Sequence, residues 1–132
     1  MRPLDLDEVL VVAEFRAALR RFLRSSELVA PTCGLTPQRY LLLLMIKGAP
    51  DRSERATVTD LSRRLHLAQN TVTDIVARSV DAGLIEREPS TDDARVTHLR
   101  LTAEGERRLA RMMSELAGER RALREAIEAL DG

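Results

Sequence analysis

The order of elements between Val58 and Arg100 constrains the fold of this chain more than any other feature. A short helix is predicted from Val58 to about Leu65, because Thr57 and Asp60 have the spacing of a capping box at a helix start. A second helix follows after His66–Ala68, a connection of the length typical of a helix-turn-helix. Alternating apolar and polar residues then predict two strands, at Leu84–Glu88 and Val96–Leu101. This order is that of a winged helix-turn-helix.

The second of these helices has one apolar side and one short polar side. Its apolar residues recur at helical spacing and predict a buried stripe of Val72, Ile75, Val76 and Val80. Gly83 suits the left-handed backbone that ends many helices. The polar residues near its start are Gln69, Asn70, Thr71 and Thr73. Amide side chains make paired hydrogen bonds to adenine edges, and the free N–H groups of a helix start suit a phosphate. We therefore predict that this turn contacts duplex DNA.

The loop between the two strands, Pro89–Arg95, is rich in turn residues and ends on an arginine. An extended Arg95 would suit the minor groove, where narrow A·T tracts concentrate negative potential. Asp93 lies two residues earlier and is placed to hold that guanidinium. On spacing alone, an ordinary surface turn with an incidental ion pair explains these residues equally well.

The net charge of the chain does not indicate a nucleic-acid-binding protein. The formal net charge is zero, and residues 58–100 hold six basic and seven acidic residues. Because a DNA-binding domain usually has a basic footprint, a winged-helix adaptor that binds protein and not DNA stays open as an alternative. Aromatic residues make up only 2% of the chain, which argues against RNA or single-strand recognition by base stacking. Lys47 is the sole lysine, and the other basic residues are arginines, which suit forked contacts to phosphate or guanine.

The segments that flank this region are predicted to be helical. A first long helix is expected from about Leu4 to Val29, with an apolar seam of Val12, Phe15, Leu19 and Phe22. Its arginines, Arg16, Arg20 and Arg24, are interpreted as a solvated face. Thr36 and Pro37 predict the start of a central helix that is buried nearly all round and ends at Gly48. A loop is expected from Ala49 to Ala56.

A last helix is predicted from Ala103 onward, with Thr102 as its cap. Its leucines fall seven apart, at Leu109, Leu116, Leu123 and Leu130. Gly118 is the expected site of a bend or split, and the segment leaves little room for two helices and a loop. Because long amphipathic helices at both ends of a small domain need a partner for their apolar faces, two copies are predicted to pair through these ends.

Several of these segments together resemble the MarR family of bacterial transcription regulators. The most specific are Asp93-Ala94-Arg95 and Leu101-Thr102-Ala103-Glu104-Gly105, which are similar to the family's wing signature. Similar residues also occur at Leu61–Leu65, at Gln69–Val76 and at Gly83–Arg87. The resemblance extends over about Leu35 to Gly105, and it rests on the order of the motifs and not on any one of them.

The resemblance implies a mainly α fold with a small β-hairpin wing in one domain, 1–132. A winged helix-turn-helix at 35–101 would be flanked by dimerisation helices at 4–30 and 103–130. It implies a homodimer on a pseudo-palindromic DNA site, repression of nearby genes, and release by a small aromatic ligand bound between the dimer and DNA-binding regions. By the same analogy, Arg95 would enter the minor groove with Asp93 bracing it, and Arg78 would bind phosphate. Ala68 departs from the serine cap common in the family, and Asp74 would repel phosphate unless it is paired.

Other residue types indicate no further chemistry. Cys33 is interpreted as an inert, partly buried thiol, with redox sensing as the less favoured reading. His66 and His98 are too isolated for a metal site, and we expect no cofactor. No catalytic serine, histidine and acid set and no glycine-rich phosphate loop occurs, so an enzyme is not expected. The lack of a long apolar span or signal peptide predicts a cytoplasmic protein without membrane contact.

Overall fold

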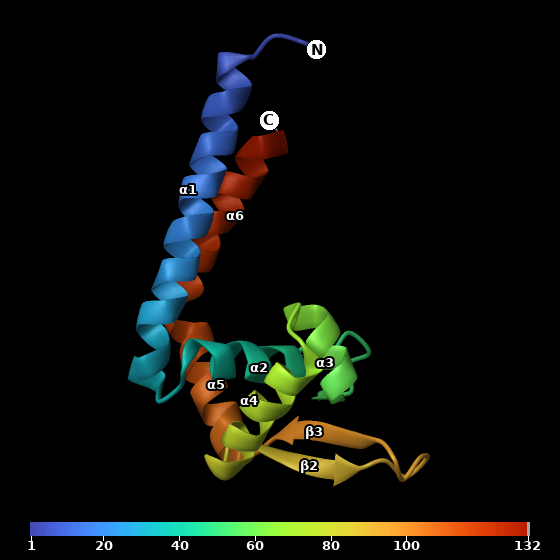
Figure 1. The fold of residues 1–132 in the computed structure, drawn as a ribbon. Helices are drawn as coiled ribbons and strands as arrows, with labels where there is room; N and C mark the ends of the chain where they lie inside the picture. Colours follow the sequence, from blue (N-terminus) through green and yellow to red (C-terminus); the bar gives the residue numbers. More distant parts are fainter. Residues whose placement is uncertain (132) are drawn as a thin grey trace.

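The computed structural model describes residues 1–131 and divides them into two parts, which we call the rod and the body. The rod consists of α1 (Leu6–Val29) and α6 (Ala117–Asp131), which lie side by side and project away from the rest of the chain (Figure 1). The body contains all the elements between them, and a short 3-10 helix, Ala30–Cys33, joins it to α1. The N-terminus and Asp131 both lie at the far end of the rod (Figure 1).

Helix α1 begins two residues later than predicted, because Asp5 caps it. The Asp5 side chain accepts a hydrogen bond from the backbone N–H of Asp7. Along its 24 residues, only Ala18 is buried. The predicted seam is therefore only partly covered: Phe15, Leu19 and Phe22 are half-buried, while Val12 is exposed.

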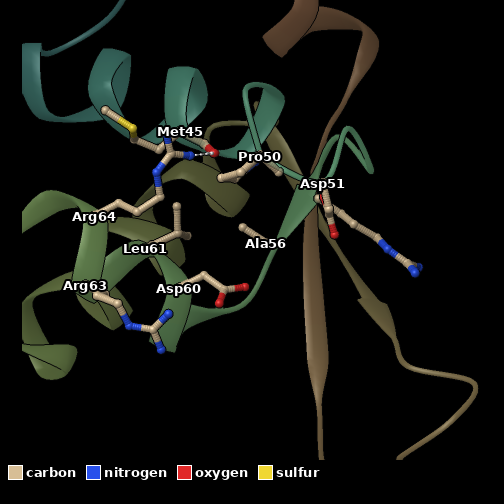
Figure 2. Close-up of a pocket in the computed structure, with 10 residues that line it drawn as sticks. Met45, Pro50, Asp51, Ala56, Asp60, Leu61, Arg63 and Arg64 are labelled. Carbon is tan, nitrogen blue, oxygen red and sulfur yellow. Dashed lines mark hydrogen bonds between the residues drawn. The ribbon is translucent and has the colours of Figure 1, made fainter.

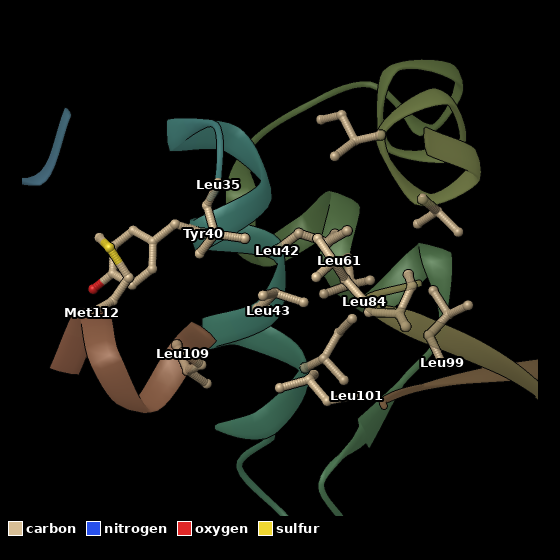
Figure 3. Packing of buried hydrophobic residues seen from close by; sticks show 14 of the residues in the cluster. Leu35, Tyr40, Leu42, Leu43, Leu61, Leu84, Leu99, Leu101, Leu109 and Met112 are labelled. Atoms are coloured by element: carbon tan, nitrogen blue, oxygen red, sulfur yellow. The ribbon is translucent and has the colours of Figure 1, made fainter. Parts of the chain in front are cut away.

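Helix α2 (Pro37–Lys47) runs through the centre of the body. Thr36 caps it by accepting a hydrogen bond from the Arg39 N–H, Pro37 takes the first turn, and Gly48 ends it, as predicted. Its buried residues are Tyr40, Leu42, Leu43 and Ile46 (Figure 3). The prediction that the helix is buried nearly all round is wrong in one respect, because Leu41 is 42% exposed.

The helix-turn-helix consists of α3 (Val58–Leu65) and α4 (Gln69–Asp81). Both halves of the predicted capping box form: Thr57 and Asp60 each accept a hydrogen bond from the other's backbone N–H. Helix α3 ends at His66, whose backbone is left-handed. The two helices bury Leu61 and the stripe Val72, Ile75 and Val76, and Val80 packs beside them. The core of the body is thus a set of mainly aliphatic side chains from α2, α3, α4, α5 (Ala103–Glu115) and the strands (Figure 3).

A three-stranded antiparallel sheet forms the wing, in the order β1-β3-β2. Strands β2 (Ile85–Pro89) and β3 (Thr97–Leu101) each begin one residue later than predicted. Strand β1 (Arg55–Ala56) lies in the segment that was predicted to be loop, so that prediction is wrong at its end. The two residues extend because they pair with β3, with Arg55 opposite Arg100 and Ala56 opposite Leu99.

The C-terminal segment forms two helices, α5 (Ala103–Glu115) and α6, with only Leu116 between them. The sequence prediction of too little room for two helices is wrong, because the junction needs no loop. The break falls at Leu116, which is fully buried, and not at Gly118, which lies within α6. The predicted leucine stripe is therefore shared: Leu109 and Leu116 belong to the core of the body, whereas Leu123 is half-buried and Leu130 is exposed.

Candidate nucleic-acid interface

The first turn of α4 presents an uncovered polar surface. The four residues predicted to face base edges, Gln69, Asn70, Thr71 and Thr73, are all exposed. Ala68 precedes them with an extended backbone and supplies no side-chain cap. Asn70 compensates in part, because its Oδ1 accepts a hydrogen bond of 2.9 Å from the Thr71 N–H. The backbone amides that open α4 are thus only partly satisfied within the protein, which favours an acceptor from outside.

Two local hydrogen bonds orient side chains in this turn. The amide of Gln69 donates through Nε2 to Oγ1 of Thr59 on α3, at 3.3 Å. The hydroxyl of Thr73 donates to the Gln69 carbonyl oxygen at 2.8 Å, so its oxygen keeps lone pairs for another donor. The helix-turn-helix therefore aims the Gln69 amide before any ligand is bound. Thr59 is a contributor that sequence reasoning missed, because its partner is ten residues away.

Arg78 lies on α4 but far from that turn. It is nine positions after Gln69 along the helix, a rise of about 14 Å at the α-helical spacing. Its Nε lies 3.2 Å from Oδ2 of Asp74, one turn earlier, and both side chains are more than half exposed. Asp74 is therefore paired. The guanidinium of Arg78 is held at the surface, with N–H groups left for a second acceptor.

The tip of the wing presents Arg95. Its side chain is 91% exposed, and its Nε and Nη2 donate to Oδ1 and Oδ2 of Asp93 at 3.2 and 3.3 Å. The backbone N–H of Arg95 also donates to Asp93, at 3.0 Å. These hydrogen bonds hold the pKa of the Asp93 carboxyl below its usual value. The predicted bracing of the arginine is thus present in the geometry, while one face and one edge of the guanidinium stay open to solvent.

The structure brings the first turn of α4 and the wing tip to either side of α3. A surface cavity of about 360 Å³ lies between the start of α3 and the wing, lined by Thr57–Thr59 and by Arg95–Thr97. Because Thr59 also contacts Gln69, one continuous surface joins these two predicted sites. Arg78 lies at the other end of α4 and is not part of this cluster.

A charged group at the base of the wing went unpredicted. Arg55 of β1 and Arg100 of β3 share the carboxylate of Glu88 on β2, each at 3.7 Å. The charges of Arg55 and Arg100 also act on Asp51 and Glu54, respectively, so positive and negative groups are mixed at this place. The clue in the sequence was Arg100, which alternates with the buried Leu99 and Leu101, but its partner Arg55 could not be placed without strand β1.

The remaining candidates lie elsewhere. Cys33 is buried at the end of the 3-10 helix and is a free thiol. Within residues 1–131, no group of three or more histidine, cysteine, aspartate or glutamate side chains is placed to hold a metal ion. Over the same residues, no helix is both long and apolar enough to cross a membrane.

Comparison with known proteins places this geometry in a family. Residues 34–96, which include the helix-turn-helix, β1, β2 and the wing loop but not β3, match a family model described as MarR family. No curated protein has a significant sequence match to the chain.

Solved structures match over nearly the whole chain. Wild-type apo MarR from E. coli is 17% identical, with a TM-score of 0.71 over 95% of this chain and 86% of that one. A mutant E. coli MarR complexed with operator DNA is 18% identical, with a TM-score of 0.68 over 92% and 85%. BpsR from Bordetella bronchiseptica, whose DNA binding is regulated by 6-hydroxynicotinic acid, is 18% identical, with a TM-score of 0.63 over 82% and 79%. At these identities, the likeness shows a shared fold that extends to the rod.

Proposed function

Because the chain belongs to the MarR family of winged helix-turn-helix transcription regulators, we propose that it is a homodimeric repressor that reads a pseudo-palindromic operator. In this proposal, the first turn of α4 enters a major groove, and Gln69, Asn70, Thr71 and Thr73 face base edges. Arg95 enters the adjacent minor groove while Asp93 fixes its direction. Arg78 binds a phosphate.

The observation that best supports the proposal is that Arg95 is exposed and yet held in one orientation. An arginine that is 91% exposed costs side-chain entropy to hold in one place, yet Asp93 grips it through both carboxylate oxygens. An exposed pair of this kind adds little to folding stability. Orientation toward a ligand outside the protein explains it better. The operator complex of E. coli MarR, a protein with the same fold, supports duplex DNA as that ligand.

The charge distribution is compatible with such a site despite the neutral total. Arg55 and Arg100, which share the carboxylate of Glu88, lie at the base of the hairpin that carries Arg95. Phosphate contacts by a few placed arginines on each of two subunits would replace a broad basic footprint. We therefore expect modest affinity for random DNA.

Pairing of two copies is supported by the exposed apolar residues of the rod. Helix α6 has no buried residue, and its Ile127 and Leu130 are exposed. On α1, the exposed apolar residues include Leu6, Val9, Leu10, Leu23 and Leu28. A second rod would cover these side chains and hold two α4 helices at a fixed separation.

Release of DNA by a small aromatic ligand is the remaining part of the proposal. It is supported by BpsR, a protein of the same fold whose DNA binding is regulated by 6-hydroxynicotinic acid, a small aromatic acid.

A gel shift with the DNA that flanks the chain's own gene tests the proposal. A salt series is included, because a protein that neutralises phosphates loses affinity steeply as counterions return to DNA. We expect a shift that weakens with salt and persists against random competitor DNA. The absence of a shift at any salt would contradict the proposal and favour a protein-binding adaptor.

A further inference from the structure

A cavity of about 410 Å³ opens on the body between the end of α2, strand β1 and helix α3 (Figure 2). Its apolar wall is formed by Met45, Pro50, Ala56 and Leu61. Ala56 and Leu61 belong to the buried core, at 4% and 0% exposure, so they close the base of the cavity but present almost no surface to it. The volume is within the range of about 300–1,000 Å³ that is usual for small-molecule sites. The cavity is separate from the residues proposed to contact DNA.

Arg64 lines this cavity in a preset position. Its Nη1 donates to the backbone carbonyl oxygens of Met45 and Gly48, each at 3.2 Å, at the C-terminal end of α2. Figure 2 marks the hydrogen bond to Met45. Both hydrogens of Nη1 are thereby engaged, and the guanidinium loses most of its freedom to rotate. Nε and Nη2 have no hydrogen-bond partner among the described residues. These two groups form one edge of the guanidinium fork, which matches the spacing of the two oxygens of a carboxylate.

The charges around the cavity favour an anion. Arg63 also lines it and forms no salt bridge within the described part of the chain. The acidic residues of the lining already accept hydrogen bonds from the backbone: Asp60 from the Thr57 N–H, and Asp51 from the Ser53 N–H. Neither acid pairs with Arg63 or Arg64. An entering carboxylate would thus meet two cations without having to displace a protein carboxylate.

The loop that forms the outer wall has an unusual backbone. Arg52 and Glu54 have φ angles of 64° and 60°, a left-handed conformation that residues with a side chain seldom adopt. Such conformations persist where surrounding contacts fix them, and they concentrate at binding sites. Here the loop carries Ala49, Pro50 and Asp51 to the edge of the cavity.

We propose that this cavity binds a small aromatic carboxylate. The carboxylate would lie on the Nε and Nη2 edge of Arg64 with Arg63 beside it. The ring would pack on Met45, Ala49 and Pro50, above the base closed by Ala56 and Leu61. The inference rests on the proposed release by a ligand, and it assigns that ligand a position in the body and not between the rod and the body. Occupancy would reach the DNA-reading turn through α3, which lines the cavity with Leu61 and contacts Gln69 with Thr59.

The test is a titration of the full chain, without DNA, with sodium benzoate and with benzamide as its neutral counterpart, followed by amide NMR shifts. We expect benzoate to give saturable shifts at Ala56, Leu61 and Arg64, and benzamide to bind at least tenfold more weakly, at about the level set by one charged hydrogen-bond pair. Because no DNA is present, the titration tests ligand binding even if the chain proves not to bind DNA.

Variants separate this site from general anion binding. Arg64→Gln is expected to weaken benzoate binding about tenfold or more, while Arg87→Gln, at an exposed arginine of β2, leaves it unchanged. Ala56→Leu fills the floor and is expected to abolish binding. Since Ala56 is buried, Ala49→Leu at the rim serves as a second blocking variant if the first does not fold.

Three results would overturn the proposal. The first is the absence of saturable shifts up to about 10 mM benzoate, well above the concentration at which a weak millimolar site fills. The second is a set of shifts confined to the junction of rod and body, around Tyr40 and Leu116. The third is equal benzoate affinity in the unmutated chain and in a folded Arg64→Gln variant.

Discussion

The body and the rod differ in how far a single copy of the chain buries their apolar side chains. In the body, α2 is surrounded by other elements, and residues such as Leu43, Ile46 and Leu61 are fully buried within one copy of the chain. In the rod, α1 buries only Ala18, and α6 buries nothing. Both helices are amphipathic, yet a single copy of the chain covers their apolar sides only in part. The core of the body is therefore fully buried within one copy of the chain. The rod exposes apolar residues in the way that one side of a protein–protein interface does.

This difference assigns separate tasks to the two parts. A closed core fixes α3, α4 and the hairpin relative to one another, so the Gln69 turn and Arg95 lie at a set spacing within each subunit. The spacing between the two copies of that surface would come from the rods alone. Changes in the body should therefore act on folding or on contacts to one half-site, and changes in the rod should act on assembly.

The largest effect is expected at Gly105 in the body. A Cβ at this position would lie 2.1 Å from the backbone oxygen of Leu84, which already accepts a hydrogen bond from the Thr102 N–H. Since a backbone group cannot easily move away, Gly105→Ala should lower the free energy of unfolding by more than about 3 kcal/mol. Urea unfolding followed by circular dichroism measures this.

Gly118 provides the matched control, because a Cβ there would meet nothing closer than 4.0 Å. Gly118→Ala lies within α6 and should stabilise that helix by roughly 0.5–1 kcal/mol. Equal destabilisation by both alanines would contradict the assignment of Gly105 to a steric requirement.

A comparable effect, on assembly and not on folding, is expected in the rod. Leu6 and Leu10 are 69% and 58% exposed and lie one helical turn apart, so charges there should not disturb the subunit. The double variant Leu6→Glu with Leu10→Glu should weaken dimerisation by about 3 kcal/mol or more, since burying each leucine is worth about 1.5–3 kcal/mol. Light scattering after size exclusion reports the mass, and an unchanged melting curve in dilute solution would show that the body is intact.

Arg87→Glu, a charge change on exposed β2, is the control for that experiment and should leave the mass unchanged. If the double variant stays dimeric, the exposed end of the rod is not the interface. Leu116→Glu would not answer the question, because Leu116 is part of the core of the body.

At the wing, the expected effect is confined to DNA. Arg95→Ala should weaken operator binding by about 1–3 kcal/mol, because it removes a positioned guanidinium from the groove, while folding and dimer mass stay the same. Fluorescence anisotropy with a labelled duplex measures this loss. A binding curve that matches that of the unmutated protein would remove the wing from the proposed mechanism.

The smallest expected effect is electrostatic. Hydrogen bonds from Arg95 lower the pKa of Asp93, so this carboxyl should titrate in the folded chain below its ordinary value of 3.8. For an acid with a depressed pKa, the associated stabilisation is present above the ordinary value and is lost as the pH falls through the depressed one. NMR of the side-chain carboxyl carbon should show the midpoint rising toward 3.8 in Arg95→Gln. A midpoint that does not move would mean that the pair is not formed in solution.

Local features of the sequence were the most predictable. The capping box of Thr57 and Asp60, the Thr36 cap and the Gly83 turn depend on residues within a few positions of one another, and all of them form. The exposure of the polar turn at Gln69 followed from helical periodicity in the same way. The spacing of Arg95 and Asp93 fitted a positioned arginine and an ordinary surface turn equally well. In the structure the two side chains are paired.

Features that depend on distant contacts escaped prediction. Strand β1 consists of two residues that extend only because β3 lies beside them. The helix break occurs at Leu116, where the rod leaves the body. The sequence prediction placed it at Gly118, because glycine tolerates a bend, but glycine does not require one. The cavity beside Arg64 brings together α2, β1 and α3, whose proximity is a property of the fold and not of any one segment.

Hydroxyl-radical footprinting of the DNA that flanks the chain's own gene tests the central claim most directly, because it reads both parts of the molecule at once. We predict two protected patches whose centres lie about 34 Å apart, one helical turn, with both patches lost together in the Leu6→Glu, Leu10→Glu variant. A single patch, or two patches that survive when the rods no longer pair, would contradict the account.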